Sequence, residues 1–585
     1  MKSFFKNLFA SILGCFIALG LVSLIGFIAL FAIIASSSET YSLQDKTVLN
    51  LKLDGVLVDR VQTTNPFLEM MGMADETQIG LDDILSSIDK AKTNDKIKGI
   101  YIEAGAFSAS SASIKEIRDK LIQFKESGKF IVSYGDVYTQ GCYYLASVAD
   151  KVVINPKGNL DWHGISSSPT FYKGLLEKLG IEMQVFKVGT FKSAVEPFIL
   201  DKMSDANRQQ VQSYANSMWG TVLKEVASSR DLTTERLNQL ADTFPLMRDP
   251  QLLVDTKMID TLMYETDARN YIKTLADIDN TAKLRLASVS NMTTVASSVK
   301  ETSKDIIAVL YAEGEITSGI GRDGITDKRL IKEIEKLSDN DKVKAVVLRV
   351  NSPGGSAYAS EQIWKAVTDL KAKKPVVVSM GGVAASGGYY ISCNASKIIA
   401  QPNTLTGSIG IFGMFPNVEG LTKKVGLTFD NVKTNKYADF GDITRPMRDD
   451  EKAVLQSYIE QGYDLFLTRC SDGRGIAKDS LDHIAQGRVW TGEQAIKIGL
   501  VDAIGGIDTA ISEAAKLAGL EAYALRDYPR KMDFFEALLE SKREDVAVEI
   551  MKEYLGSEYK TFETIRNIKN QDCIQARIPY GFDAQ

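Results

Sequence analysis

The stretch Gly135-Asp-Val-Tyr-Thr-Gln-Gly-Cys-Tyr-Tyr144 returns 246 positions later as Gly381-Gly-Val-Ala-Ala-Ser-Gly-Gly-Tyr-Tyr390. The same offset places residues 98–200 on residues 344–446 without a gap. Shared glycines and tyrosines at one fixed spacing indicate that the chain contains an internal duplication. The sequence therefore predicts two copies of one structural unit.

Each copy is predicted to be an α/β unit in which strands and helices alternate. The first half has apolar strands at Val48–Gly55, Ile97–Glu103, Phe130–Tyr134 and Lys151–Asn155, with a charged helix at Ser113–Gly128. The second half repeats them at Ile306–Gly314, Val343–Val350, Val376–Ser379 and Lys397–Gln401, with a helix at Ala359–Lys373. Strands separated by helices of this length imply parallel pairing through crossover connections. We expect an N-terminal repeat at residues 47–300, a C-terminal repeat at residues 305–525, and a helical extension of unknown role at residues 526–585.

The amino terminus carries a long uncharged segment. Leu8 to Ala35 contains 28 residues without a charged side chain, and Lys2 and Lys6 precede it. A bilayer span needs about 20 apolar residues, whereas the apolar core of a cleaved signal peptide has about 7–15. The segment therefore predicts a transmembrane anchor at residues 8–35 behind a cytoplasmic stub at residues 1–7, because lysines favour the cytoplasmic side. A cleaved signal peptide is the alternative interpretation.

Charge and composition exclude several classes of function. The formal net charge is −6 and no block of like charges occurs, which argues against a nucleic-acid partner. The two histidines, His163 and His483, have no metal-like neighbour pattern, and the five cysteines show no CxxC spacing. We therefore expect neither a metal nor a cofactor.

The two halves differ at the positions that carry reactive side chains. Ser386 falls on Gln140 of the first half, and Lys192 falls on Ala438 of the second half. Each half has thus lost the residue that the other half keeps. This pattern predicts one composite active site that is built from both repeats.

Ser386 is the candidate nucleophile. It lies in Ala384-Ala-Ser-Gly-Gly388, where an apolar strand turns into a helix, so that unsatisfied N–H groups at the helix start can stabilise negative charge. A serine that simply caps the helix is the alternative. Upstream, Asn351-Ser-Pro-Gly-Gly-Ser356 follows another buried strand and can aim N–H groups at an oxyanion. A plain tight turn is the alternative there, although the first half has Ser108 and Ala109 in place of these glycines.

Lys192 is the candidate general base. Neither histidine is well placed for that role, and Lys192 occurs in the apolar stretch Phe191-Lys-Ser-Ala-Val-Glu-Pro-Phe198. A lysine acts as a base only when its pKa falls from about 10.4 towards 7–8, which requires apolar surroundings. A solvated surface lysine is the alternative interpretation.

These motifs resemble those of the signal peptide peptidase A (protease IV) family, in its long, duplicated, membrane-anchored form within the ClpP/crotonase-like superfamily. The resemblance covers nearly all of residues 8–525. It is carried by Gly189-Thr-Phe-Lys-Ser-Ala-Val-Glu-Pro-Phe198, Asn351-Ser-Pro-Gly-Gly-Ser356, Ala384-Ala-Ser-Gly-Gly-Tyr389, Leu405-Thr-Gly-Ser-Ile-Gly410 and Arg488-Val-Trp-Thr-Gly492. It implies an α/β fold of two tandem β-β-α spiral repeats after one N-terminal transmembrane helix.

The resemblance also implies a role for each site residue. Ser386 corresponds to the nucleophile and Lys192 to the general base. Gly354 and the N–H group of Gly387 correspond to the oxyanion hole. Ser408 corresponds to a serine that orients the lysine amine, and the first half has Trp162 at that position.

The implied function is a serine endopeptidase that degrades remnant signal peptides after their release from preproteins, through an acyl-enzyme intermediate. Its substrates are apolar segments with small residues near the cut. The resemblance further implies a homotetramer at the bacterial inner membrane, with a cytoplasmic N-terminus and a periplasmic catalytic part. Two alternatives stay open at this point: an acyl-CoA hydratase-like enzyme with glutamate acid/base groups, and a membrane-anchored scaffold without activity.

Overall fold

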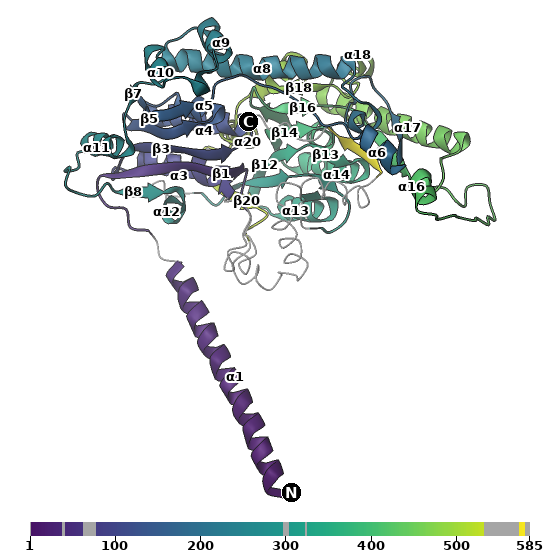
Figure 1. Ribbon diagram of the computed structural model, residues 1–585, viewed down its shortest axis with the longest axis horizontal. Helices are drawn as coiled ribbons and strands as arrows, with labels where there is room; N and C mark the ends of the chain where they lie inside the picture. The colour runs from purple at the N-terminus through teal and green to yellow at the C-terminus, as the bar shows by residue number, and fades with distance from the viewer. Residues whose placement is uncertain are drawn as a thin grey trace.

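The computed structural model describes residues 2–37, 41–61, 78–296, 303–321, 324–531 and 573–578. Two sheets built mainly of parallel strands lie side by side, one from each half of the chain (Figure 1). The first has the order β2-β1-β3-β4-β5-β7, with β8 paired to β1. Its strands are β1 (Thr47–Val58), β2 (Gln78–Gly80), β3 (Ile97–Ser108), β4 (Phe130–Tyr138), β5 (Lys151–Leu160), β7 (Thr261–Leu262) and β8 (Leu286–Ser288).

The second sheet has the order β18-β16-β14-β12-β9-β20, with β15 paired to β14 and β19 paired to β15. Its strands are β9 (Ile306–Glu313), β12 (Val343–Ser352), β14 (Val376–Ala385), β15 (Lys397–Ala400), β16 (Leu405–Gly407), β18 (Val489–Thr491), β19 (Ala503–Ile504) and β20 (Ala524–Tyr528). Parallel pairing is confirmed in both halves, for β1 with β3 and β4 as for β9 with β12 and β14. Because helices cover both faces, β12 is buried almost throughout.

Helices surround the two sheets and complete two large apolar cores, one in each half. Those of the first half are α3 (Leu81–Thr93), α4 (Ser111–Lys125), α5 (Gln140–Ala146), α6 (Lys173–Leu179), α7 (Glu196–Ile199), α8 (Asp205–Arg230), α9 (Thr234–Asp242), α10 (Gln251–Asp255), α11 (Glu265–Leu275) and α12 (Val289–Thr294), with a 3₁₀ turn at Pro245–Met247. Those of the second half are α13 (Asp327–Asp339), α14 (Ala357–Lys373), α15 (Gly387–Ser392), α16 (Glu419–Lys424), α17 (Asp449–Arg474), α18 (Lys478–Ile484), α19 (Gly492–Lys497) and α20 (Ile507–Ala518).

A third sheet joins the two halves. Its order is β11-β10-β13-β21-β17-β6, where β6 (Glu182–Lys187) belongs to the first half, β21 to the carboxyl-terminal extension and the other strands to the second half. The remaining strands are β10 (Ile316–Thr317), β11 (Ile325–Thr326), β13 (Gly354–Ser356), β17 (Phe412–Asn417) and β21 (Ile574–Arg577). Strand β6 pairs antiparallel with β17, from Glu182↔Asn417 to Lys187↔Phe412. The loop after β6, which carries Lys192, is thereby held against the second half.

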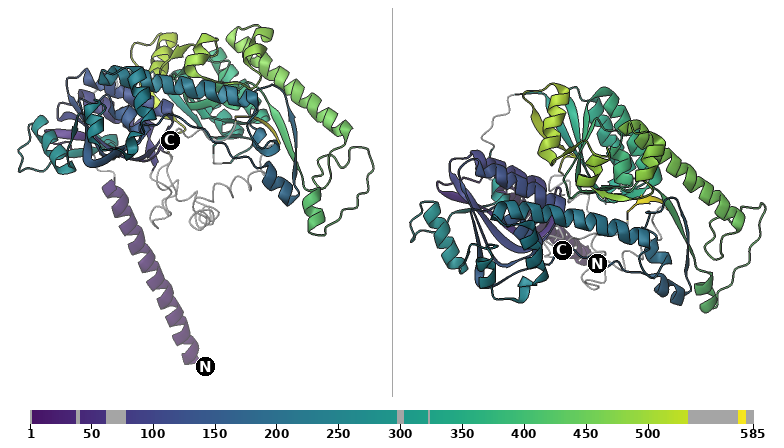
Figure 2. Two further views of the ribbon diagram at one scale, coloured as in Figure 1. Left: turned by 45° about the horizontal axis from the view of Figure 1, so that its top comes forward. Right: turned by 90° about the horizontal axis from the view of Figure 1, so that it is seen from above.

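The amino-terminal segment forms one helix, α1 (Lys2–Ser37), which projects away from the two sheets (Figures 1 and 2). Over the residues that the structure describes, no helix combines the length and the apolar character that crossing a bilayer requires. The predicted transmembrane anchor at residues 8–35 is therefore not supported.

The carboxyl-terminal extension departs from the expected arrangement. The helices expected over Asp533–Lys569 lie outside the described residues. Within the extension, Ile574–Arg577 forms strand β21, which inserts between β13 and β17. Strand β20, at residues 524–528, continues the second sheet across the expected boundary at residue 525. The extension therefore contributes strands to the folded body, which the sequence did not predict.

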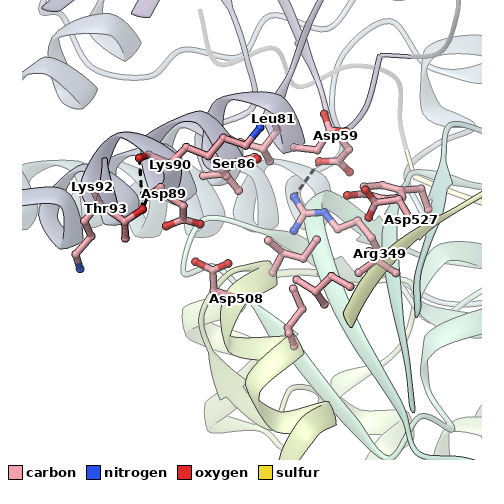
Figure 3. A pocket seen from close by; sticks show the side chains of 17 residues that line it. Asp59, Leu81, Ser86, Asp89, Lys90, Lys92, Thr93, Arg349, Asp508 and Asp527 are labelled. Atoms are coloured by element: carbon pink, nitrogen blue, oxygen red, sulfur yellow. Dashed lines mark hydrogen bonds and ion pairs between the residues drawn. The ribbon is translucent and has the colours of Figure 1, made fainter. Parts of the chain in front are cut away.

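A buried ion cluster joins the two halves of the chain. Arg349 on β12 is 1% exposed, and its Nη2 and Nη1 lie 2.8 Å from Asp59 Oδ1 and 2.7 Å from Glu116 Oε1. Both carboxylates belong to the first half. Figure 3 shows Asp59 and Arg349 facing one another on the wall of a cavity of about 580 Å³. Neither Lys192 nor Ser386 lines this cavity, so it is distinct from the candidate active site.

Replacing Arg349 with methionine is expected to destabilise the protein by about 3–5 kcal/mol, because it leaves the Asp59 and Glu116 carboxylates buried without their cation. The fall in the urea midpoint of unfolding measures this effect. Lys365→Met is the matched control, since Lys365 forms an exposed ion pair with Asp369 and exposed pairs contribute less than about 1 kcal/mol. Equal shifts for the two variants would contradict a structural role for the cluster.

Candidate active site

Ser386 lies in the turn between strand β14 and helix α15. Its backbone has φ +55° and ψ −113°, a conformation that a residue with a side chain rarely adopts. The backbone N–H group donates to the carbonyl of Gly407 at 2.8 Å, and the side chain is fully buried. A strained turn of this kind, from strand to helix, projects a serine hydroxyl into a site.

Lys192 reaches Ser386 from the other half of the chain. Its Nζ atom lies 2.7 Å from Ser386 Oγ, although the two residues are 194 positions apart. Ser408 lies beside them, with its Oγ atom 3.1 Å and its carbonyl oxygen 3.2 Å from the same Nζ atom. The structure therefore brings together the three side chains that the sequence analysis singled out.

The lysine is buried without an opposite charge. Its side chain is 1% exposed, and within the described part of the chain no carboxylate forms an ion pair with it. Burial lowers the pKa of Lys192 well below its usual value, because desolvation penalises the ammonium form. A neutral amine at this distance can accept a proton from the serine hydroxyl.

The loop that carries Lys192 is fastened to the second half at several points. Gly487 packs so closely that a Cβ atom on it would lie 2.7 Å from Cα, Cβ and N of Lys192. The N–H group of Phe191 donates to the carbonyl of Gln486 at 2.9 Å. Gln210 on α8 donates to the carbonyl of Phe191 at 3.0 Å and accepts from the N–H group of Val489 at 3.2 Å. Sequence reasoning missed Gln210 and Gly487, because both act only through contacts made in the folded chain.

The positions that correspond to these three residues in the opposite half of the chain are filled differently. The Gln140 side chain, at the start of α5, donates to the carbonyl of Gly164 at 3.2 Å and accepts from the N–H group of Gly164 at 3.0 Å. Trp162 is buried and donates to the carbonyl of Leu237 at 2.9 Å. Ala438 is exposed in the loop between α16 and α17. Within the described part of the chain, the serine, the lysine and the second serine thus come together at one place.

Two consecutive glycines, Gly354 and Gly355, lie beside Ser386 with φ +99° and +155°. A side chain on Gly354 is excluded, since its Cβ atom would lie 2.0 Å from the carbonyl oxygen of Ala576 and 2.8 Å from the nitrogen of Gly387. The N–H group of Gly354 donates to Ser352 Oγ at 3.2 Å. The backbone at Gly354 and Gly387 therefore surrounds the Ala576 carbonyl oxygen.

Strand β21 occupies a slot between β13 and β17. It pairs antiparallel with β13 through Gly354↔Arg577 and Gly355↔Ala576, and with β17 through Phe412↔Gln575. The N–H group of Ile578 donates to the carbonyl of Pro353 at 3.0 Å. Because hydrogen-bonded pairs alternate along an antiparallel ladder, Gly355 and Ala576 form the next such pair. The N–H group of Gly355, rather than that of Gly354, therefore faces the Ala576 carbonyl.

This arrangement has the components of an acyl-transfer site. It combines a buried hydroxyl, an amine that can be neutral, and glycine backbone packed against a carbonyl oxygen of an extended peptide. The slot that holds β21 binds peptide main chain as an added strand. Among the described residues, no group of three or more histidine, cysteine, aspartate or glutamate side chains is placed to hold a metal ion.

The chain matches known proteins over most of its length. A family model described as peptidase family S49 matches residues 123–279 and 368–521, and a Clp protease model matches residues 298–406. Protease 4 of Haemophilus influenzae is 36% identical over 521 residues, which cover 85% of this chain and 84% of that protein. Protease 4 of Salmonella typhi is also 36% identical, over 84% of this chain and 82% of its own. The chloroplastic serine protease SPPA of Arabidopsis thaliana is 30% identical over 74% of this chain and 64% of its own.

Proposed function

The chain belongs to peptidase family S49 and is a serine protease, and from this premise we propose that Lys192 and Ser386 form its catalytic dyad and degrade remnant signal peptides. The observation that carries the proposal is the 2.7 Å contact between Lys192 Nζ and Ser386 Oγ in a fully buried setting. A serine hydroxyl needs a base to become a nucleophile. Lys192 is the basic side chain in contact with it.

In the proposed mechanism, neutral Lys192 takes the hydroxyl proton while Ser386 Oγ attacks the carbonyl carbon of the substrate. The proton then passes from the lysine to the leaving amine, and an acyl-enzyme remains on Ser386. A water molecule, deprotonated by the same lysine, attacks the ester and releases the second product. Ser408 positions the amine through its Oγ atom, 3.1 Å from Nζ.

The oxyanion that forms during attack needs N–H donors close to the carbonyl oxygen. The sequence predicts Gly354 and Gly387 for this role. The position of the Ala576 carbonyl supports Gly387, whose Cβ atom would lie 3.2 Å from that oxygen. Because the N–H group of Gly354 donates to Ser352 Oγ, we propose Gly355 as the donor on β13.

The slot between β13 and β17 supports the proposed class of substrate. It accepts an extended main chain with strands on both sides, which a folded domain does not offer. Ala576, whose carbonyl lies at the glycines, is fully buried, and a small residue fits best there. A released signal peptide, with small residues near the cut, meets both requirements.

The full chain is expected to hydrolyse an unstructured, apolar, signal-peptide-like peptide and to leave a stably folded globular protein intact. Product formation for both substrates, followed by mass spectrometry, measures this. Adding the same peptide sequence as a loop within the folded protein provides the matched control. If the wild-type chain hydrolysed no peptide, the alternative of a scaffold without activity would be supported. Equal cleavage of the folded protein would contradict the claim that the slot between β13 and β17 admits only extended main chain.

Location and assembly stay predictions. Helix α1 exposes apolar side chains, among them Phe16, Leu19 and Val22, and Lys2 and Lys6 precede them. Because no described helix meets the requirements for a membrane span, the proposed location at the bacterial inner membrane, with the catalytic part in the periplasm, rests on the family resemblance. Recovery of the protein in the soluble fraction after cell lysis would contradict it. The homotetramer rests on the family resemblance, and the molar mass of the detergent-solubilised protein tests it.

A further inference from the structure

An apolar cluster lies at the end of β21, next to the candidate active site. The Ile578 side chain is 7% exposed and packs among side chains of both halves of the chain. Its neighbours in the cluster are Tyr214 and Met218 on α8, Ala385 on β14, Leu405 on β16 and Val489 on β18. Helix α8 crosses from the first half towards the second along one face of the molecule (Figure 2). The cluster is thus a composite of the two repeats, like the dyad.

The register of β21 relates this cluster to the bond that would be cleaved. The Ala576 carbonyl lies at Gly355 and Gly387, where the carbonyl under attack belongs. The bond after it joins Ala576 to Arg577, so Ile578 takes the place of the second residue of a leaving peptide. Side chains alternate along a strand, and Ala576 and Ile578 therefore face the same side. Both side chains are buried, which agrees with this alternation.

The space around Ile578 suits an apolar side chain. It continues into a groove of about 440 Å³ that is lined by apolar side chains, among them Val383 and Leu405, and by uncharged polar ones such as Ser166 and Asn207. The described residues that line this groove include no aspartate, glutamate, lysine or arginine. A charged substrate side chain would lose its water there without gaining a counter-charge.

We propose that this cluster is a substrate subsite on the leaving-group side, which selects an aliphatic residue at the second position after the cleaved bond. The inference rests on the proposed function and adds to it a sequence preference beyond the cut. Tyr214 and Met218 are specificity-determining residues of this subsite. In the structure, the side chain of Ile578 occupies the subsite. A substrate displaces this side chain when it binds.

The test uses three peptides that differ only at this position, with isoleucine, alanine or aspartate. In the wild-type chain, kcat/KM is expected to be at least tenfold higher for isoleucine than for aspartate, as for other apolar pockets. Met218→Ala is expected to lower the isoleucine-to-alanine ratio of kcat/KM several-fold. Met247→Ala is the matched control, because Met247 is exposed and outside the cluster.

A second readout separates this inference from the proposed function. Binding of the same three fluorescent peptides to Ser386→Ala, measured by anisotropy, is expected to show the same order of affinity without turnover. Equal kcat/KM for isoleucine and aspartate, or equal affinity in the binding assay, would overturn the subsite and leave the cluster as packing for the chain's own tail. Absence of hydrolysis together with ordered binding would contradict the proposed dyad alone.

Discussion

Ser386→Ala is expected to lower kcat/KM for an apolar signal-peptide-like peptide by about four to six orders of magnitude, since loss of a nucleophile removes the acyl-enzyme route. The remaining hydrolysis would come from the oxyanion donors and from substrate binding alone. The substitution removes one oxygen atom from a fully buried side chain. The substitution leaves the backbone strain of the turn unchanged, because alanine has a Cβ atom as serine does and must adopt the same φ of +55°.

Initial rates over a range of peptide concentrations measure the effect, and near-UV circular dichroism checks that the fold is intact. Ser457→Ala is the matched control, since Ser457 lies exposed on α17. Turnover by Ser386→Ala within tenfold of the wild type would show that another group is the nucleophile.

Lys192→Met is expected to reduce kcat/KM by a similar factor, because no other described residue brings a basic side chain to the Ser386 hydroxyl. Lys192→Arg is expected to be equally inactive, since a guanidinium stays protonated and cannot accept the proton. In the wild type, kcat/KM should rise with pH while the amine of Lys192 loses its proton and then level off. Burial moves this rise well below the usual lysine pKa.

Lys192→Met is also expected to raise the stability of the folded chain, although it lowers the activity. The pKa of Lys192 is lower in the folded chain than in the unfolded chain, so between these two values the unfolded state binds more protons. The free-energy cost of burying Lys192 is therefore greatest at pH values below the pKa of the folded chain. This cost disappears as the pH rises to the pKa of the unfolded chain. Lys192→Met is expected to raise the midpoint of thermal unfolding at neutral pH. An unstable Lys192→Met variant, or one whose activity follows the wild-type pH profile, would contradict a neutral buried base.

The two repeats were predictable because their information is local and periodic. Short apolar segments such as Val376–Ser379, each followed by a turn and a helix, predict strands that pair in parallel. The structure confirms this pairing. The meeting of Lys192 and Ser386 followed from comparing the repeats, since each half keeps one reactive residue. This inference needed no knowledge of which atoms touch.

Other features depend on contacts that no local pattern records. Ile574–Arg577 is a strand only because β13 and β17 leave a slot for it, and its four residues carry no strong strand signal. Arg349 interrupts an apolar strand, and its partner Asp59 lies 290 positions away. Gly354 and Gly355 are equivalent in sequence, whereas in the structure their N–H groups point to different acceptors.

Covalent labelling by a serine-reactive fluorophosphonate, followed by peptide mapping, tests most directly that one dyad spans the two repeats. The account predicts a single label on the peptide that contains Ser386, formed faster as the pH rises. It also predicts that Lys192→Met, although folded, is not labelled at a measurable rate. A label on another serine, or labelling of Lys192→Met at the wild-type rate, would contradict the composite site.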